Sequence, residues 1–194
     1  MGGVGDARTD EIVERVLSRK PTCGSTRVVA IDGPAGSGKT TLAGEVADEL
    51  SQRGQVVVLH HMDDQYDDWV GLDPQPSEDL ARRVVTQVLA PLAEHRPARW
   101  QRYDWYAGRF DGWETFDPPG VLVLEGCGSG ARDYDPFTTL LVWVEAGRDE
   151  RIRRGIARDG EQVLDHWLAW MDSEQAHFAR HATRDRADLR VSTD

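Results

Sequence analysis

The 194-residue sequence predicts an α/β fold in which helices cover both faces of a mostly parallel, five-stranded sheet. Two observations lead to this prediction. Short, continuous apolar runs, which are typical of strands buried on both faces, alternate with longer segments of helical periodicity. A glycine-rich turn joins the first apolar run to the helical segment that follows it. Because ligands of such sheets bind at the carboxyl ends of the strands, the residues after each strand are the first candidates for a functional site.

The predicted elements follow in chain order. A short amphipathic helix over residues 10–19 lies in an N-terminal extension (residues 1–25) ahead of the main domain (residues 26–194). The apolar runs predict five strands, at residues 28–31, 56–59, 121–124, 140–144 and 189–191. Helical spacing predicts helices over residues 39–53, 77–94, 148–158 and 161–180. Ser77 is the predicted N-cap of the second of these, and Pro91 is expected to kink or split it. Residues 69–76 and 96–120 are predicted to be irregular, the latter because they are rich in aromatic residues, Pro and Gly.

The balance of charges limits the classes of partner. The chain carries 23 Lys and Arg against 34 Asp and Glu, a formal net charge of −11. Nucleic acids and membrane surfaces are polyanionic, so a general binder of either is excluded. Two cysteines are too few for a disulfide framework, and no apolar run is long enough to span a membrane. With no recognisable secretion signal, we expect a cytoplasmic protein.

Residues 33–40, Gly-Pro-Ala-Gly-Ser-Gly-Lys-Thr, match the phosphate-binding pattern G-x-x-x-x-G-K-[ST]. Glycines allow backbone N–H groups to converge on a phosphate, and the following helix adds its positive N-terminus. A chance glycine-rich turn is disfavoured because the motif follows a predicted strand and opens a helix. The motif predicts a P-loop NTPase, a three-layer α/β/α sandwich, with ATP as cofactor and Lys39 as a catalytic cation. The predicted phosphate-binding residues are Gly33, Ala35, Gly36, Ser37, Gly38, Lys39, Thr40 and Thr41.

Acidic residues follow two strands that end at the same edge of the predicted sheet as the phosphate loop. Asp63 comes after the second strand and Glu125 after the third. Carboxylate oxygens suit Mg²⁺, so both are expected to converge on Mg²⁺ and the γ-phosphate, with the Thr40 hydroxyl as a further metal ligand. The nearby polar residues are predicted to be solvated or structural: Asp64, Asp67 and Asp68 in the acidic loop, His60 and His61, which lack partners at metal-ligand spacing, and Cys127, mainly a packing residue.

An ordered set of segments resembles the uridine kinase-like branch of P-loop kinases, which includes phosphoribulokinase and pantothenate kinase. The resemblance runs from about residue 28 to residue 191. Beyond the phosphate loop it rests on residues 63–66 (Asp-Asp-Gln-Tyr), residues 103–105 (Tyr-Asp-Trp), Glu125-Gly126, and the arginine-rich stretch with Arg151, Arg154 and Arg158-Asp159. It implies a kinase with a short helical lid.

The resemblance also implies roles for individual residues. Asp63 would be the base that activates an acceptor hydroxyl, and Thr40 with Glu125 would hold Mg²⁺. Arg154 and Arg158 would steady the transferring phosphoryl group.

Departures from the family pattern limit what the resemblance implies. Gln65 stands where the family usually has Phe, and no His follows the Tyr-Asp-Trp segment. Recognition of a uridine or cytidine base is therefore not implied. Arg151 and Arg153 are assigned to a solvated helix face rather than to the site.

Seven aromatic residues lie between positions 100 and 116, with arginines among them. We interpret this segment as a substrate wall, because rings stack on flat or sugar-like acceptors. A packing subdomain or a homodimer contact is an alternative, and single-stranded nucleic acid is the least favoured partner given the acidic chain. The predicted substrate-binding residues are Tyr66, Tyr103, Trp105 and Arg109.

Three functions fit these features. The favoured one is an ATP-dependent kinase that, with Mg²⁺, transfers the γ-phosphoryl group to a hydroxyl of a small nucleoside-like metabolite. A nucleoside monophosphate kinase would need no base but several arginines for the acceptor phosphate. A non-transferring NTPase or nucleotide-binding switch would act independently of any acceptor. The identity of the acceptor, whether a primary metabolite or an antibiotic, stays open.

Overall fold

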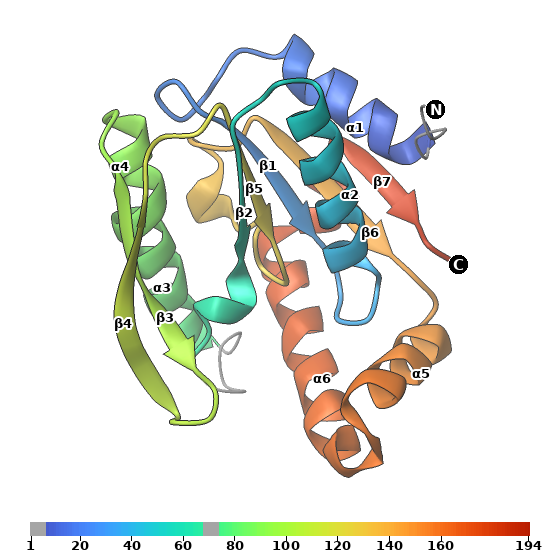
Figure 1. Cartoon of the computed structure of the whole chain (residues 1–194). Coiled ribbons are helices and arrows are strands. Elements are labelled where there is room, and N and C mark those ends of the chain that lie inside the picture. Colours follow the sequence, from blue (N-terminus) through green and yellow to red (C-terminus); the bar gives the residue numbers. More distant parts are fainter. Residues whose placement is uncertain (1–6, 68–73) are drawn as a thin grey trace.

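The sheet that the sequence predicts is present, and all of its strand pairs are parallel. The protein is described from a computed structural model, and the description extends over residues 7–67 and 74–194. The strand order is β2-β5-β1-β6-β7 and helices lie on both faces, so the three-layer α/β/α sandwich is confirmed (Figure 1). The strands are β1 (Arg27–Asp32), β2 (Val57–His61), β5 (Val121–Glu125), β6 (Leu140–Glu145) and β7 (Leu189–Ser192).

Central strands contribute side chains to two separate cores. On one face, α1 (Ala7–Ser18) and α2 (Lys39–Gln52) pack with strand residues that include Val29 and Val123. On the other face, Val28 and Leu122 pack with side chains of α6 (Leu164–His181) and of the helical segment over residues 74–93. Successive strand residues point to opposite faces, and both sets are buried. This double burial explains why β1 and β5 are continuous apolar runs.

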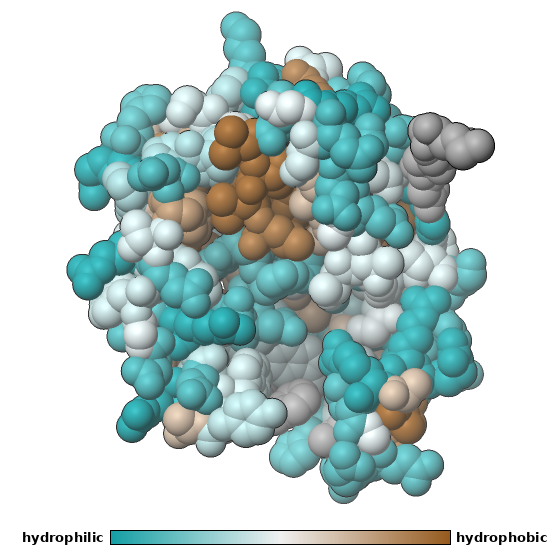
Figure 2. Space-filling model, viewed as in Figure 1, coloured by the Kyte–Doolittle hydropathy of each residue, from teal (hydrophilic) through white to brown (hydrophobic). Residues whose placement is uncertain are grey.

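Strand β2 is less buried than the sequence predicts, because it lies at the edge of the sheet. Val57, Val58 and Leu59 are partly exposed, and Val56, just before the strand, is 71% exposed. Figure 2 shows apolar side chains on the surface over this part of the molecule. An apolar run does not distinguish an edge strand from a central one, so the prediction of burial on both faces is wrong for β2.

The helical segment before the aromatic stretch has three consecutive parts: α3 (Pro74–Val84), a π-helical turn (Val85–Leu89) and α4 (Ala90–Ala93). The predicted break at Pro91 is confirmed, because proline has no N–H for the preceding turn and the π-helical turn lies just before it. The helix begins at Pro74, so the N-cap predicted at Ser77 is wrong. The remainder of the predicted loop, residues 69–73, lies outside the described residues.

The prediction that residues 96–120 are irregular is also wrong. They contain an antiparallel hairpin of β3 (Ala98–Asp104) and β4 (Arg109–Phe116). A register shift between Trp100 and Arg102 breaks the two-residue alternation that would identify β3 from its sequence. The turn is built by the Asp104 carboxylate, which accepts the N–H groups of residues 106 and 107 at 2.8 and 2.9 Å.

The C-terminal third supplies the predicted helical lid. Helix α5 (Arg148–Asp159) and helix α6 are joined by a short 3₁₀ turn, Glu161–Val163, which confirms both predicted helices (Figure 1). At the other end of the chain, the predicted first helix is α1, whose fully buried Ile12, Val13 and Val16 join the same core as α2. A domain boundary at residue 25 stays a prediction. Across the two described stretches, no helix combines the length and apolarity that crossing a membrane requires.

Helix α6 carries a buried histidine, His177, that should make the stability of the fold depend on pH. Neither ring nitrogen of His177 has a hydrogen-bond partner among the described residues, and its ring packs 4.3 Å from that of His181. Burial, with smaller contributions from His181 and Arg180, lowers the pKa of His177 to about 3, from 6.5. Between these values the unfolded chain binds more protons than the native protein, so the free energy of unfolding falls as the pH falls from 6.5 towards 3.

We therefore expect a His177→Leu variant to lose less stability in acid than the wild type. The slope of unfolding free energy against pH should decrease by about 1.4 kcal/mol per pH unit within this range. Urea unfolding at several pH values measures it. Gln175→Leu, at an exposed position on the same helix that carries no titratable group, is the control and should keep the wild-type slope. An unchanged slope in His177→Leu would contradict the assignment.

Candidate active site

The phosphate loop connects β1 to α2, and its glycines are required by its shape. Gly36 and Gly38 have φ values of +77° and +89°, which side chains rarely adopt. At Gly36 a Cβ atom would also lie 2.6 Å from the backbone oxygen of Arg151. The glycine spacing of the motif therefore reflects both backbone conformation and the close approach of α5.

Two buried charged residues flank the loop. The Lys39 ammonium donates to the carbonyl of Pro34 at 3.0 Å; burial acts to lower its pKa, but nearby acidic groups, led by Cys127 and Glu125, raise it overall. Asp32, the last residue of β1, accepts backbone N–H groups from Gly33, Gly128 and Gly130 at 2.7, 2.9 and 2.9 Å. Burial raises the pKa of Asp32 to about 6, against the effect of these donors. Asp32 thus ties the phosphate loop to the glycine-rich turn after β5, a role that sequence reasoning missed.

The candidate metal ligands Thr40 and Glu125 lie close together at the carboxyl ends of the strands. The hydroxyl of Thr40, in the first turn of α2, donates to Glu125 Oε1 at 3.1 Å. The other oxygen of Glu125 is 2.7 Å from His61 Nδ1, and this hydrogen bond raises the pKa of His61. Oxygen donors of this kind fit Mg²⁺, which takes one or two carboxylates and completes its shell with water and phosphate oxygens. Within the two described stretches, no group of three or more His, Cys, Asp and Glu is placed to hold a metal ion by itself.

The two histidines differ. His60 is buried, contacts Gln65 at 2.7 Å and packs edge-on against Trp100, which confirms a structural role for it. Burial lowers its pKa to about 4. Gln65, the departure from the family pattern, thus supplies a polar partner for a buried imidazole. His61 is instead half-exposed beside Glu125, and its role as an ordinary structural residue stays a prediction.

Asp63 lies in a short 3₁₀ turn, Met62–Asp64, directly after β2. Its surroundings raise its pKa, first through desolvation and then through the charge of Glu125, whereas Lys39 and Arg158 act in the opposite direction. The backbone carbonyl of Asp63 accepts the indole N–H of Trp105 at 3.1 Å. Asp64 points elsewhere and pairs with Arg102 at 3.1 Å. The hairpin therefore holds the turn that carries Asp63.

A cleft of about 490 Å³ brings these groups together. Its floor is the phosphate loop with Lys39, Thr40 and Thr41, and its walls come from the ends of β2 and β5, the hairpin and the lid. The side chains that line it beyond the loop are Asp63, Tyr66, Trp105, Glu125, Cys127, Arg154, Arg158, Asp159, Trp167 and Trp170.

The predicted substrate residues divide into two groups. Trp105 and Tyr66 line the cleft; the Tyr66 hydroxyl donates to the backbone carbonyl of Cys127 at 2.7 Å, so this ring is a fixed wall. Tyr103 and Arg109 are not among the residues that line the cleft. Tyr103 is buried between hairpin rings, and the Arg109 side chain is 70% exposed and lies 3.7 Å from Asp111.

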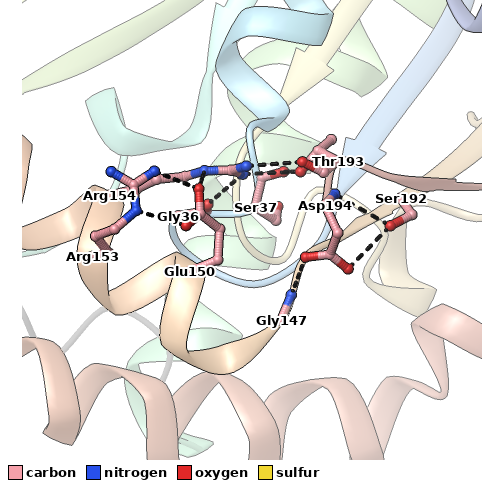
Figure 3. Close-up of polar contacts among 9 residues, drawn as sticks. All are labelled: Gly36, Ser37, Gly147, Glu150, Arg153, Arg154, Ser192, Thr193 and Asp194. Atoms are coloured by element: carbon pink, nitrogen blue, oxygen red, sulfur yellow. Dashed lines mark hydrogen bonds and ion pairs between the residues drawn. The ribbon is translucent and has the colours of Figure 1, made fainter.

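The lid arginines are already engaged. Arg154 donates to the carbonyl of Gly36 and to both oxygens of Thr193 in the C-terminal tail, and it pairs with Glu150 at 2.7 Å (Figure 3). Thr193 in turn donates to the carbonyl of Ser37 at 2.8 Å. Arg154 therefore braces the outer side of the phosphate loop.

Arg158 lines the cleft, pairs with Asp159 at 2.8 Å and lies 5.8 Å from the ring of Trp167. Arg153 is exposed, as predicted, and pairs with Glu150. Arg151 does not lie on a solvated face: its side chain is 13% exposed and is ion-paired with the buried Glu174 at 2.8 Å. The assignment of Arg151 to solvent is wrong, because the polar face of α5 packs against α6 and the phosphate loop.

Fold and site together define a P-loop kinase. Residues 29–179 match the family model described as an AAA domain, and the chain belongs to that family. It is 24% identical over 183 residues to a uridine kinase of Lactobacillus johnsonii, with 84% of this chain and 85% of the relative covered. A uridine kinase of Halobacterium salinarum is 26% identical over 182 residues, with 83% and 77% covered.

Solved structures show the same fold. A possible uridine kinase from Bacillus stearothermophilus superposes with a TM-score of 0.69 at 22% identity, over 95% of this chain and 97% of that chain. The resemblance to uridine kinase-like P-loop kinases that the motifs predict is therefore confirmed.

Proposed function

We propose that this protein is an ATP-dependent kinase that transfers the γ-phosphoryl group to a hydroxyl of a nucleoside-like small molecule. The observation that supports this most is the meeting of Lys39, Thr40, Asp63 and Glu125 around one cleft. Phosphoryl transfer needs a cation at the phosphates, a metal ligand set and a group that orients or deprotonates the acceptor. This cleft offers all three.

Each residue has a distinct part in the proposed reaction. Lys39 and the loop N–H groups bind the β- and γ-phosphates. Thr40 and Glu125 would hold Mg²⁺, which spreads the negative charge of the phosphates. Asp63 accepts the proton of the acceptor hydroxyl, and its raised pKa suits a base better than that of an ordinary carboxylate. Arg158 supplies positive charge from the lid.

The engaged arginines favour a hydroxyl acceptor over a monophosphate acceptor. A phosphate acceptor calls for arginines with free N–H groups. Among the described cleft residues, Arg154 is committed to Thr193, Gly36 and Glu150, and Arg158, which is paired with Asp159, is assigned to the transferring phosphoryl group. Asp63 faces the same space. An anionic acceptor would meet this carboxylate without a dedicated partner.

ADP formation across a panel of acceptors tests the proposal. Nucleosides and other uncharged polyols should stimulate ADP release, whereas nucleoside monophosphates should not. Stimulation by monophosphates alone would favour the monophosphate kinase, and ADP release independent of every acceptor would favour a simple NTPase. The cytoplasmic localisation, the lack of nucleic-acid and membrane partners, and the homodimer contact stay predictions.

The contact between His61 and Glu125 leads to a prediction about Mg²⁺. Removing the partner of a metal-binding carboxylate weakens its orientation, at a typical cost of about 10-fold to 100-fold in metal affinity. We expect His61→Ala to raise the Mg²⁺ concentration for half-maximal activity by about tenfold. Titration of activity with Mg²⁺ at saturating ATP measures this shift. An unchanged midpoint would show that His61 does not position Glu125 for the metal.

A further inference from the structure

Both lid helices contact the phosphate loop at one residue, Ala35. The backbone N–H of Ala35 donates to Glu174 Oε2 of α6 at 2.7 Å. Arg151 of α5 approaches the carbonyl oxygen of Ala35 with Nη1 at 3.3 Å, and the same Nη1 is 2.8 Å from Glu174 Oε1. An ion pair formed between α5 and α6 therefore holds the donor and the acceptor of the same loop residue.

The ion pair between Arg151 and Glu174 is buried. The side chains of Arg151 and Glu174 are 13% and 3% exposed. Burial raises the pKa of Glu174, and the N–H of Ala35 with the charges of Lys39 and Arg151 acts against that rise. A buried ion pair adds little net stability compared with apolar side chains of similar volume, so stability alone does not account for its presence.

The position of Ala35 in the loop indicates what the pair does instead. Ala35 immediately precedes Gly36, whose backbone turns against the backbone of Arg151. The position of Ala35 therefore determines the backbone conformation at the left-handed residue that follows it. It also determines the direction in which the later N–H groups of the loop point.

We propose that Arg151 and Glu174 are positioning residues that hold the phosphate loop in its nucleotide-binding shape and couple it to the two lid helices. This inference rests on the proposed function only in taking ATP as the ligand. Neither side chain needs to touch the nucleotide.

Their opposite charges make the proposal testable. If the pair acted only through its charges, Glu174→Gln would remove a negative charge near the phosphates and tighten ATP binding, whereas Arg151→Gln would weaken it. If the pair positions the loop, both variants weaken binding. Glu174→Asp separates the two roles further, because it keeps the charge but shortens the side chain by one methylene.

The experiment measures the ATP dissociation constant by calorimetry and the melting temperature of each variant. We expect Glu174→Gln, Arg151→Gln and Glu174→Asp each to raise the dissociation constant by about tenfold, the scale of one lost hydrogen bond to a charged group. The charge-matched controls are Arg153→Gln on α5 and Asp172→Asn on α6, both exposed. They should stay within about twofold of wild type.

Opposite shifts in Glu174→Gln and Arg151→Gln, or unchanged binding in Glu174→Asp, would overturn the inference. Melting temperatures show which variants are folded at the temperature of the titration; should Glu174→Gln be unfolded, the Glu174→Asp result decides. The readout is nucleotide binding, so a wild-type protein that binds ATP but phosphorylates no acceptor would contradict the proposed function alone. A wild-type protein that binds no nucleotide would contradict both.

Discussion

An Asp63→Asn variant is expected to lose about three orders of magnitude in phosphoryl transfer while its affinity for ATP changes little. The amide keeps the shape of the side chain but cannot accept the proton of an acceptor hydroxyl. ATP contacts the loop and Lys39, which this substitution leaves in place. Single-turnover kinetics measure the loss in transfer rate, and the ATP dissociation constants of the variant and the wild type measure the change in affinity.

Asp64→Asn is the matched control for this variant. Asp64 is the next residue of the same turn, but its carboxylate pairs with Arg102 on the hairpin. It should retain most of the wild-type activity, because an exposed ion pair of this kind contributes little. Activity of Asp63→Asn close to that of wild type would show that Asp63 is not the base.

A Lys39→Met variant should lose both ATP binding and transfer. Methionine fills a similar volume, so the buried site stays packed. The lost ammonium no longer offsets the charge of the triphosphate or of Glu125 and Glu174, which remain nearby. We expect ATP affinity to fall by at least about tenfold and the transfer rate by about 10³-fold. Unchanged nucleotide binding would contradict the position assigned to the triphosphate.

The sheet could be predicted well because its central strands are buried on both faces. Val28 to Ile31 and Val121 to Leu124 have no polar residue, and few structures other than a doubly covered strand produce such short, uninterrupted apolar runs. The hairpin was missed for the opposite reason. A bulge after Trp100 breaks the alternation of β3, and β4 is largely exposed, so neither periodicity nor apolarity marks the two strands.

Some residues of the candidate site could likewise be predicted from the sequence and others could not. Asp63 and Glu125 follow from the rule that parallel strands present their carboxyl ends on one edge, and Thr40 follows from the phosphate-loop motif. Arg151 and Glu174 do not, because charged residues on a helix are usually solvated, and no pattern in one sequence tells which of them will pair across two helices. The contact of His61 with Glu125 could not be predicted either, because the two residues are far apart in the sequence and are brought together by the pairing of adjacent strands.

The most direct test of the central claim is to follow the γ-phosphoryl group itself. With γ-³²P-labelled ATP, Mg²⁺ and a panel of nucleosides and related polyols, the label should appear in an organic product that alkaline phosphatase can cleave. The amount of this product should equal the ADP formed. Label recovered entirely as inorganic phosphate, whichever acceptor is supplied, would contradict a kinase and identify an NTPase instead.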